Sequence, residues 1–220
     1  YTEATSWDDD PKWYPGETLS VAIGQGALSV NALQLAVMTS RLANGRKAVQ
    51  PRLIKSVDGK PYAEASFPDL PFSNAHLDIV RAGMAAVAND VTGTGYRASQ
   101  LGLGDILMAG KTGTAQSRDY KPGESRGPRN AVWSRRDHAL FVSFAPHDAP
   151  EVAVSVVVEH GMGGSLAAAP IARDIMLAAL YDDIPPLDAY PSPQRGTIRS
   201  QFEMMNLREP LAPSQGRSRA

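Results

Sequence analysis

The sequence has 220 residues, of which 43% are apolar and 20% charged, and its formal net charge at pH 7 is −1. These values are ordinary for one large globular domain, or part of one, and disfavour a nucleic-acid binder, which is normally basic. The absence of cysteine excludes disulfides, a thiol nucleophile and a thiolate metal site. No apolar run reaches the ~18–20 residues of a membrane span, and the start, Tyr1-Thr2-Glu3, has neither a signal-peptide pattern nor an initiator Met. We therefore expect the chain to begin inside a longer protein.

The first part of the chain predicts a loop, a helix and a short hairpin. Residues 1–20 carry an acidic run and two prolines, which is typical of a loop. Ser29 is a suitable N-cap for a helix that extends to about Asn44. Apolar residues cover most of the circumference of this helix, so we expect it to be buried. The segment 52–57 predicts a strand that leads into an Asp58-Gly59 hairpin turn.

The second part predicts an α+β fold, in which helices flank an antiparallel sheet. A second helix, capped by Asn74, is expected over about residues 75–89. The segments 138–145 and 151–160 read as two strands joined by a short proline-containing loop, and a closing helix follows from Ser165 to about Tyr181. Residues 182–220 show no apolar periodicity, so we expect a disordered tail.

One stretch combines a strand with polar groups suited to binding an anion. The apolar segment Ile106–Ala109 predicts a buried strand, which runs directly into G-K-T-G-T. Lys111 supplies a positive charge, Thr112 and Thr114 can donate hydrogen bonds, and Gly113 leaves room for a ligand along the backbone. Because side chains alternate along a strand, a ligand meets all four residues only along the rim of an edge strand. Such a rim suits a peptide carboxylate or a developing oxyanion.

Two known kinds of site share these letters. A phosphate-binding P-loop needs a glycine five residues before Gly110, where this chain has Asp105, and a helix after Thr112, where it has Gly113 and a loop. The P-loop hypothesis therefore fails on spacing and on context. The K-T-G signature of penicillin-binding proteins and serine β-lactamases belongs on a strand beside a serine nucleophile. The position of K-T-G-T at the end of a predicted strand meets that requirement.

Other segments extend this match in the order found in one family. With them, the chain resembles the C-terminal part of the transpeptidase domain of the class B, elongation-type penicillin-binding proteins (penicillin-binding protein 2), over roughly residues 12–181. The segments that carry the resemblance are Lys12–Thr18, Ile23–Gly26, Lys111–Gln116, Asp137–Phe141, Ser143–Pro146 and Glu159–Gly161. The resemblance implies an incomplete serine β-lactamase/transpeptidase-like fold, with residues 1–181 in the domain and 182–220 as its tail.

The resemblance also implies a chemistry and a place for each K-T-G residue. In this family a serine of an S-x-x-K motif attacks the penultimate D-alanyl carbonyl of a peptidoglycan stem peptide, and the acyl group then passes to an amine of a neighbouring strand. By this resemblance Lys111 and Thr114 are catalytic, and the backbone N–H of Thr114 is half of an oxyanion hole. Thr112, Gly113 and Thr114 bind substrate. No cofactor or metal is implied.

The implied setting is the periplasmic face of the bacterial inner membrane, with an N-terminal anchor that this chain lacks. The implied partners are stem peptides, β-lactams and a membrane-embedded glycosyltransferase of the elongation machinery, and no nucleic acid. No serine here is followed by lysine three residues later, so we expect the nucleophile to lie upstream of this chain. Ser29-Val30-Asn31 matches the S-x-N motif in letters only, because it stands where a helix begins. The alternative function is a non-catalytic sensor or structural module with the same fold.

Several further residues leave two interpretations open. Gln25, between two glycines, could touch substrate or pack under the cleft. His138 and His160 have no acidic partner at ligand spacing, so a core or rim position is favoured over a metal site. The tryptophans at 7, 13 and 133 are more typical of packing anchors than of sugar platforms. The basic segment 117–136 is either a solvated loop or a means of attracting an anionic peptide.

Overall fold

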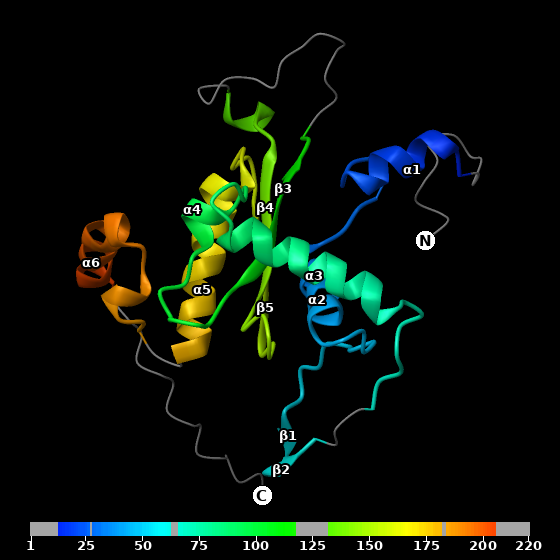
Figure 1. Ribbon diagram of the computed structural model, residues 1–220, viewed down its shortest axis with the longest axis horizontal. Coiled ribbons are helices and arrows are strands. Elements are labelled where there is room, and N and C mark those ends of the chain that lie inside the picture. The colour runs from blue at the N-terminus through cyan, green and yellow to red at the C-terminus, as the bar shows by residue number, and fades with distance from the viewer. Residues whose placement is uncertain (1–12, 27, 63–65, 118–131, 182–183, 206–220) are drawn as a thin grey trace, which may run out of the picture.

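The computed structural model describes residues 13–26, 28–62, 66–117, 132–181 and 184–205. Its centre is an antiparallel sheet of β3 (Ala109–Ala115), β4 (His138–Ala145) and β5 (Val152–Val158), in the order β3-β4-β5 (Figure 1). The expected hairpin of two strands is confirmed, and the strand that carries K-T-G pairs with the first of them. This strand begins at Ala109 rather than at Ile106. Ile106 and Leu107, which were expected to be buried in it, lie before the strand and are exposed.

Helices cover both faces of this sheet, as the α+β prediction requires. Odd-numbered residues of β4, such as Phe141, pack in one apolar cluster with α5 (Ala169–Tyr181) and the π-helical turn Gly164–Ala168 before it. The even-numbered Phe144 packs in a second cluster with α2 (Ala32–Ala43) and α3 (Asn74–Asn89). The period-two alternation of β4 therefore produces a three-layer arrangement.

Short polar motifs set where helices α2 and α3 begin. The side chain of Asn31 accepts a 2.9 Å bond from the Gln34 N–H, and the Gln34 side chain accepts one from the Asn31 N–H, forming a capping box. Helix α2 thus begins after Asn31, and the expectation that Ser29 is the cap is wrong. The predicted helix α3 is confirmed, but its cap is Ser73 and Asn74 is its first residue, so the expectation that Asn74 is the cap is wrong. Helix α4 (Tyr96–Ser99) follows a turn at residues 92–95.

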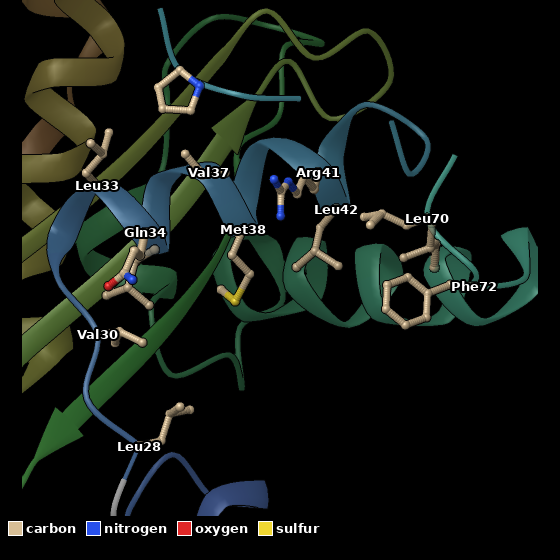
Figure 2. Close-up of a pocket in the computed structure, with 13 residues that line it drawn as sticks. Leu28, Val30, Leu33, Gln34, Val37, Met38, Arg41, Leu42, Leu70 and Phe72 are labelled. Atoms are coloured by element: carbon tan, nitrogen blue, oxygen red, sulfur yellow. The ribbon is translucent and has the colours of Figure 1, made fainter. Parts of the chain in front are cut away.

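Helix α2 is not the buried helix that its composition predicts. Only Thr39 and Ala43 of this helix are buried, whereas Leu33 is 59% exposed and Met38 is 44% exposed. Leu33 and Met38 line an apolar hollow of about 670 Å³ together with Leu70 and Phe72. Figure 2 shows Leu33, Met38 and Leu42 around it, with Phe72 closing its far end. One face of α2 therefore packs on the sheet and the opposite face stays apolar without being covered by the described residues.

The N-terminal part of the described chain contains a helix where a loop was predicted. Helix α1 spans Pro15–Ala22, with proline at its first position, and the Glu17 carboxylate accepts a 2.7 Å bond from the Tyr14 N–H. Pro15 and Gly16 are typical of a turn, but proline also suits the first helical position. The hairpin turn at Asp58-Gly59 is confirmed, between two-residue strands β1 (Ser56–Val57) and β2 (Lys60–Pro61), but the strand expected over 52–57 is formed only by its last two residues. The acidic run lies outside the described residues.

The expected disordered tail is wrong for residues 184–205. Two 3₁₀ turns, at Leu187–Ala189 and Ser192–Gln194, lead into helix α6 (Arg195–Met204), which lies beyond α5 in Figure 1. Tyr190 and Ile198 are buried against Leu177 of α5. A few well-placed apolar residues thus anchor a segment whose overall composition suggested disorder, and the polar tail after residue 205 lies outside the described part. None of the helices described is long and apolar enough to cross a bilayer.

Candidate active site

The K-T-G residues lie on β3, which pairs on one side with β4. Within the described ranges, no strand pairs with the other side of β3. The register places Lys111 opposite Val142 and Thr112 opposite Phe141. Lys111 therefore projects from the face covered by α2 and α3, and Thr112 from the face covered by α5. The geometry brings the four predicted site residues together on one edge strand.

Two hydrogen bonds show which backbone groups face that free edge. The side-chain amide of Gln25 donates to the Thr114 carbonyl at 2.8 Å, and the Lys111 ammonium donates to the Thr112 carbonyl at 2.6 Å. In an antiparallel strand the N–H and C=O of one residue point the same way, and consecutive residues alternate. The N–H groups of Thr112 and Thr114 therefore also point away from β4. An outward N–H at Thr114 is the geometry that an oxyanion donor requires.

Lys111 is exposed, and its charge is not neutralised by a described acidic residue. The ion pairs found in the described part involve other basic groups, such as those of Arg46 and Lys47 with Asp69. The ammonium is held close to the strand by its bond to the Thr112 carbonyl. A positive charge fixed beside the free edge of β3 attracts an anionic ligand group.

Glycines bring the elements behind β3 into close contact. A Cβ added to Gly164 would lie 2.7 Å from the Gly113 carbonyl oxygen, which is inside any normal contact distance. A Cβ on Gly110 would lie 2.6 Å from the ring of Phe141. The π-helical turn that precedes α5 therefore packs directly on the backbone of the K-T-G strand. This contact supports the strand from behind and explains part of the glycine run at 161–164.

Two residues of the site come from distant segments. The Thr94 and Thr112 hydroxyls lie 3.0 Å apart, which joins the turn after α3 to the strand. Gln25 follows α1, and its side-chain amide binds the backbone of β3. The sequence favoured packing over a substrate contact for Gln25, and it gave Thr94 no role. Neither contact produces a local pattern, because the partners are 18 and 89 residues apart.

His138, at the start of β4, and His160, just after β5, lie in a cluster of tilted aromatic rings. The ring centroids of His138 and His160 are 4.7 Å apart, and Trp133 lies 4.1 Å from His160. The His160 N–H donates to Nδ1 of His138 at 3.0 Å, and Nδ1 of His160 bonds the Arg136 carbonyl at 2.8 Å. Both Nδ1 atoms thus make hydrogen bonds within the protein, and Trp133 contacts the His160 ring while remaining 58% exposed. In the described part no three potential metal-ligating side chains converge.

Three comparisons identify proteins similar to this chain. The family model of the penicillin binding protein transpeptidase domain matches residues 2–177. The peptidoglycan D,D-transpeptidase MrdA of Haemophilus influenzae is 34% identical over 201 residues, which are 88% of this chain and 31% of that protein. The MrdA of Acinetobacter baumannii is 39% identical over 162 residues, covering 71% of this chain and 23% of that protein.

Solved structures of penicillin-binding proteins are also similar to this chain. The crystal structure of Pseudomonas aeruginosa PBP2 in complex with WCK 5153 matches with a TM-score of 0.60 and 38% identity, over 81% of this chain and 36% of that one. Helicobacter pylori PBP2, solved in complex with MreC, matches with a TM-score of 0.59 and 32% identity, over 77% and 28%. The chain thus spans about a third of the relatives it matches. It belongs to the family of penicillin binding protein transpeptidase domains.

Proposed function

We propose that this chain is the C-terminal part of a peptidoglycan D,D-transpeptidase, which cross-links stem peptides through a serine acyl-enzyme. The observation that carries the proposal is the outward-facing N–H of Thr114, on an edge strand that also holds Lys111 and two threonine hydroxyls. The curated relatives bear the name peptidoglycan D,D-transpeptidase. The same edge binds β-lactams, whose carboxylate and strained carbonyl mimic the donor peptide.

Each residue of the edge has a role in this reaction. The serine oxygen, supplied from outside this chain, adds to the penultimate D-alanyl carbonyl, and the resulting oxyanion accepts a bond from the Thr114 N–H. One such donor is typically worth ~3–4 kcal/mol of barrier. The Thr112 and Thr114 hydroxyls bind the terminal carboxylate, Gly113 leaves the peptide room, and Lys111 supplies positive potential. The terminal D-alanine departs with a proton, and an amine of a second strand then takes the acyl group.

The remainder of the domain has two places to pack on this chain. The apolar hollow over α2 needs a cover of apolar side chains, because so large an apolar surface is costly in water (Figure 2). The free side of β5 can pair with another strand. We assign residues 1–181 to the transpeptidase domain, and place the S-x-x-K serine in the part that covers the hollow.

The same proposal sets the cellular context. Peptidoglycan is assembled outside the cytoplasm, so the site works at the periplasmic face of the inner membrane, with a membrane anchor outside this chain. The PBP2 of Helicobacter pylori has been solved in complex with MreC. A partner of that kind, and a membrane-embedded glycosyltransferase that supplies uncross-linked strands, fit the role of a transpeptidase.

The test is covalent labelling with a fluorescent penicillin. We expect the complete protein to be labelled at a stoichiometry near one and this chain alone to remain unlabelled, because it holds no S-x-x-K serine. Labelling of the isolated chain at that stoichiometry would falsify the placement of the nucleophile. Failure of the complete protein to react would overturn the proposed function. A protein that is labelled but transfers no stem-peptide acyl group to an amine would be a sensor instead.

A further inference from the structure

We propose that Thr94 is a positioning residue for substrate: its hydroxyl donates to the Thr112 hydroxyl and thereby orients the Thr112 proton toward the substrate carboxylate. This inference rests on the proposed function. The two oxygens lie 3.0 Å apart, and Thr94 is exposed while Thr112 is half-buried on the edge strand. The pair therefore lies at the surface, where a ligand can reach it.

The turn that carries Thr94 is held firmly at its start. The Asp90 carboxylate accepts bonds from the Thr92 N–H at 2.8 Å and from the Thr92 hydroxyl at 2.7 Å. The Gly93 N–H donates to the Asp90 carbonyl at 2.8 Å. These three bonds fix the backbone immediately before Thr94. The hydroxyl of Thr94 therefore projects from a defined point rather than from a loose loop.

Close packing fixes the other side of the turn. A Cβ on Gly93 would lie 2.8 Å from the Val87 carbonyl carbon, so only glycine fits against the end of α3. The Gly95 N–H donates to the Val87 carbonyl at 3.0 Å, and a Cβ on Gly95 would lie 3.4 Å from the ring of Phe141. Phe141 is the residue opposite Thr112 in the β3–β4 register. The turn and the strand thus share one packed support.

The proton count of a hydroxyl pair gives this contact a direction. Each threonine has one O–H donor and can accept through its lone pairs. A carboxylate only accepts, so Thr112 can bind one only if its own proton points at the ligand. Its lone pairs then need another donor, and Thr94 is placed to supply it. In the reverse orientation the Thr112 hydroxyl would donate to Thr94 and would have no proton left for the ligand carboxylate. A chain of this kind also polarises its terminal donor, which strengthens the bond to the anion.

The test compares Thr94→Val with Thr94→Ser in the complete protein. The measured quantities are the acylation rate constant and the half-saturating concentration for a penicillin with its free carboxylate. We expect Thr94→Val to raise the half-saturating concentration about five- to tenfold, the size of one lost hydrogen bond, with the acylation step little changed. Thr94→Ser keeps the donor and should restore binding to near the parent value.

A second substrate separates orientation of the carboxylate bond from mere support of the turn. We expect the Thr94→Val defect to disappear for the same penicillin with its carboxylate esterified. The matched control is Thr92→Val, which removes a hydroxyl of the same turn that points to Asp90 instead. An equal defect on acid and ester, an equal defect in Thr92→Val, or no defect in Thr94→Val overturns the inference. Absence of any acylation in the parent protein would instead refute the proposed function.

Discussion

The side-chain amide of Gln25 donates a 2.8 Å hydrogen bond to the backbone carbonyl of Thr114, joining residues 89 positions apart. The bond lies on the side of β3 that faces away from β4, next to the N–H that we assign to the oxyanion hole. Because this bond holds the Thr114 carbonyl, it fixes the plane of the peptide bond that follows Thr114. It thereby restrains Thr114 itself, whose N–H is the proposed oxyanion donor. The segment after α1 thus secures the end of the K-T-G strand.

Replacing Gln25 should impair acylation without unfolding the protein. We expect Gln25→Ala in the complete protein to lower the second-order acylation rate by about fivefold, since a single hydrogen bond contributes on the order of 1 kcal/mol. Stopped-flow measurement with a chromogenic β-lactam gives this rate. Gln50→Ala, at another accessible glutamine, serves as control and should match the parent. An unchanged rate in Gln25→Ala would mean that the strand holds its shape unaided.

Lys111 should be required for acylation and dispensable for folding. Its side chain is exposed, so truncation to alanine leaves no cavity in the core. We expect Lys111→Ala in the complete protein to abolish nearly all labelling by a fluorescent penicillin while the melting temperature stays within a degree or two, as is usual for exposed positions. Lys60→Ala, at an exposed lysine of the β1–β2 hairpin, is the charge-matched control. Acylation within a few-fold of the parent would remove Lys111 from the mechanism.

The C-terminal segment should contribute to stability. Ile198 is 6% exposed and packs with Tyr190 and Leu177. We expect Ile198→Ala to lower the free energy of unfolding by about 2–4 kcal/mol, because a buried side chain of this size leaves a cavity when truncated. Urea denaturation of the complete protein measures this loss. Thr197→Ala changes the exposed neighbour and should have little effect. Equal stability of both variants would show that α6 does not pack in solution.

The turn before Thr94 should weaken at low pH. Hydrogen bonds from the Thr92 N–H and, second, from the Thr92 hydroxyl hold the pKa of Asp90 below its ordinary value of 3.8. A carboxyl with a lowered pKa stabilises the fold above its ordinary pKa, and this stabilisation disappears as pH falls through the lowered pKa. We therefore expect Asp90→Asn to lower the melting temperature at neutral pH, with a difference from the parent that shrinks below pH 3.8.

Thermal melts at a series of pH values check this expectation. Asp78→Asn removes a charge from an exposed position of α3, the helix that ends just before Asp90, and controls for the general effect of charge on stability. A difference between Asp90→Asn and the parent that stays constant down to the most acidic sample would show that the ionised carboxylate does not hold the turn.

The free side of β5 should make the isolated chain self-associate. Val152–Val158 is uncharged and strongly β-forming, and in the described part it pairs only with β4. We expect light scattering after size exclusion to detect oligomers, and Val157→Lys, at a residue 41% exposed, to reduce them. A stable monomer at tens of micromolar, with slow hydrogen exchange over residues 152–158, would mean that another part of the chain covers this edge.

The sequence alone determined the family, the central sheet and the K-T-G strand. The apolar, β-forming segments 138–145 and 151–160, and the apolar approach to Lys111, are local patterns that indicate strands facing a core. They also predicted β4 and β5 as neighbouring strands joined by a short loop. Helices α3 and α5 were also predictable, because both combine a capping or glycine start with apolar residues at helical spacing.

Only the tertiary structure decided which residues complete the site and which surfaces stay uncovered. Thr94 and Gln25 reach β3 across 18 and 89 residues, and nothing in their own neighbourhoods reports the contact. The exposure of Leu33 on α2 and the burial of Ile198 on α6 depend on what lies opposite each helix, not on its composition. Periodicity records that a side chain avoids water. Which other residues cover that side chain is decided by the packing of segments that are distant in sequence.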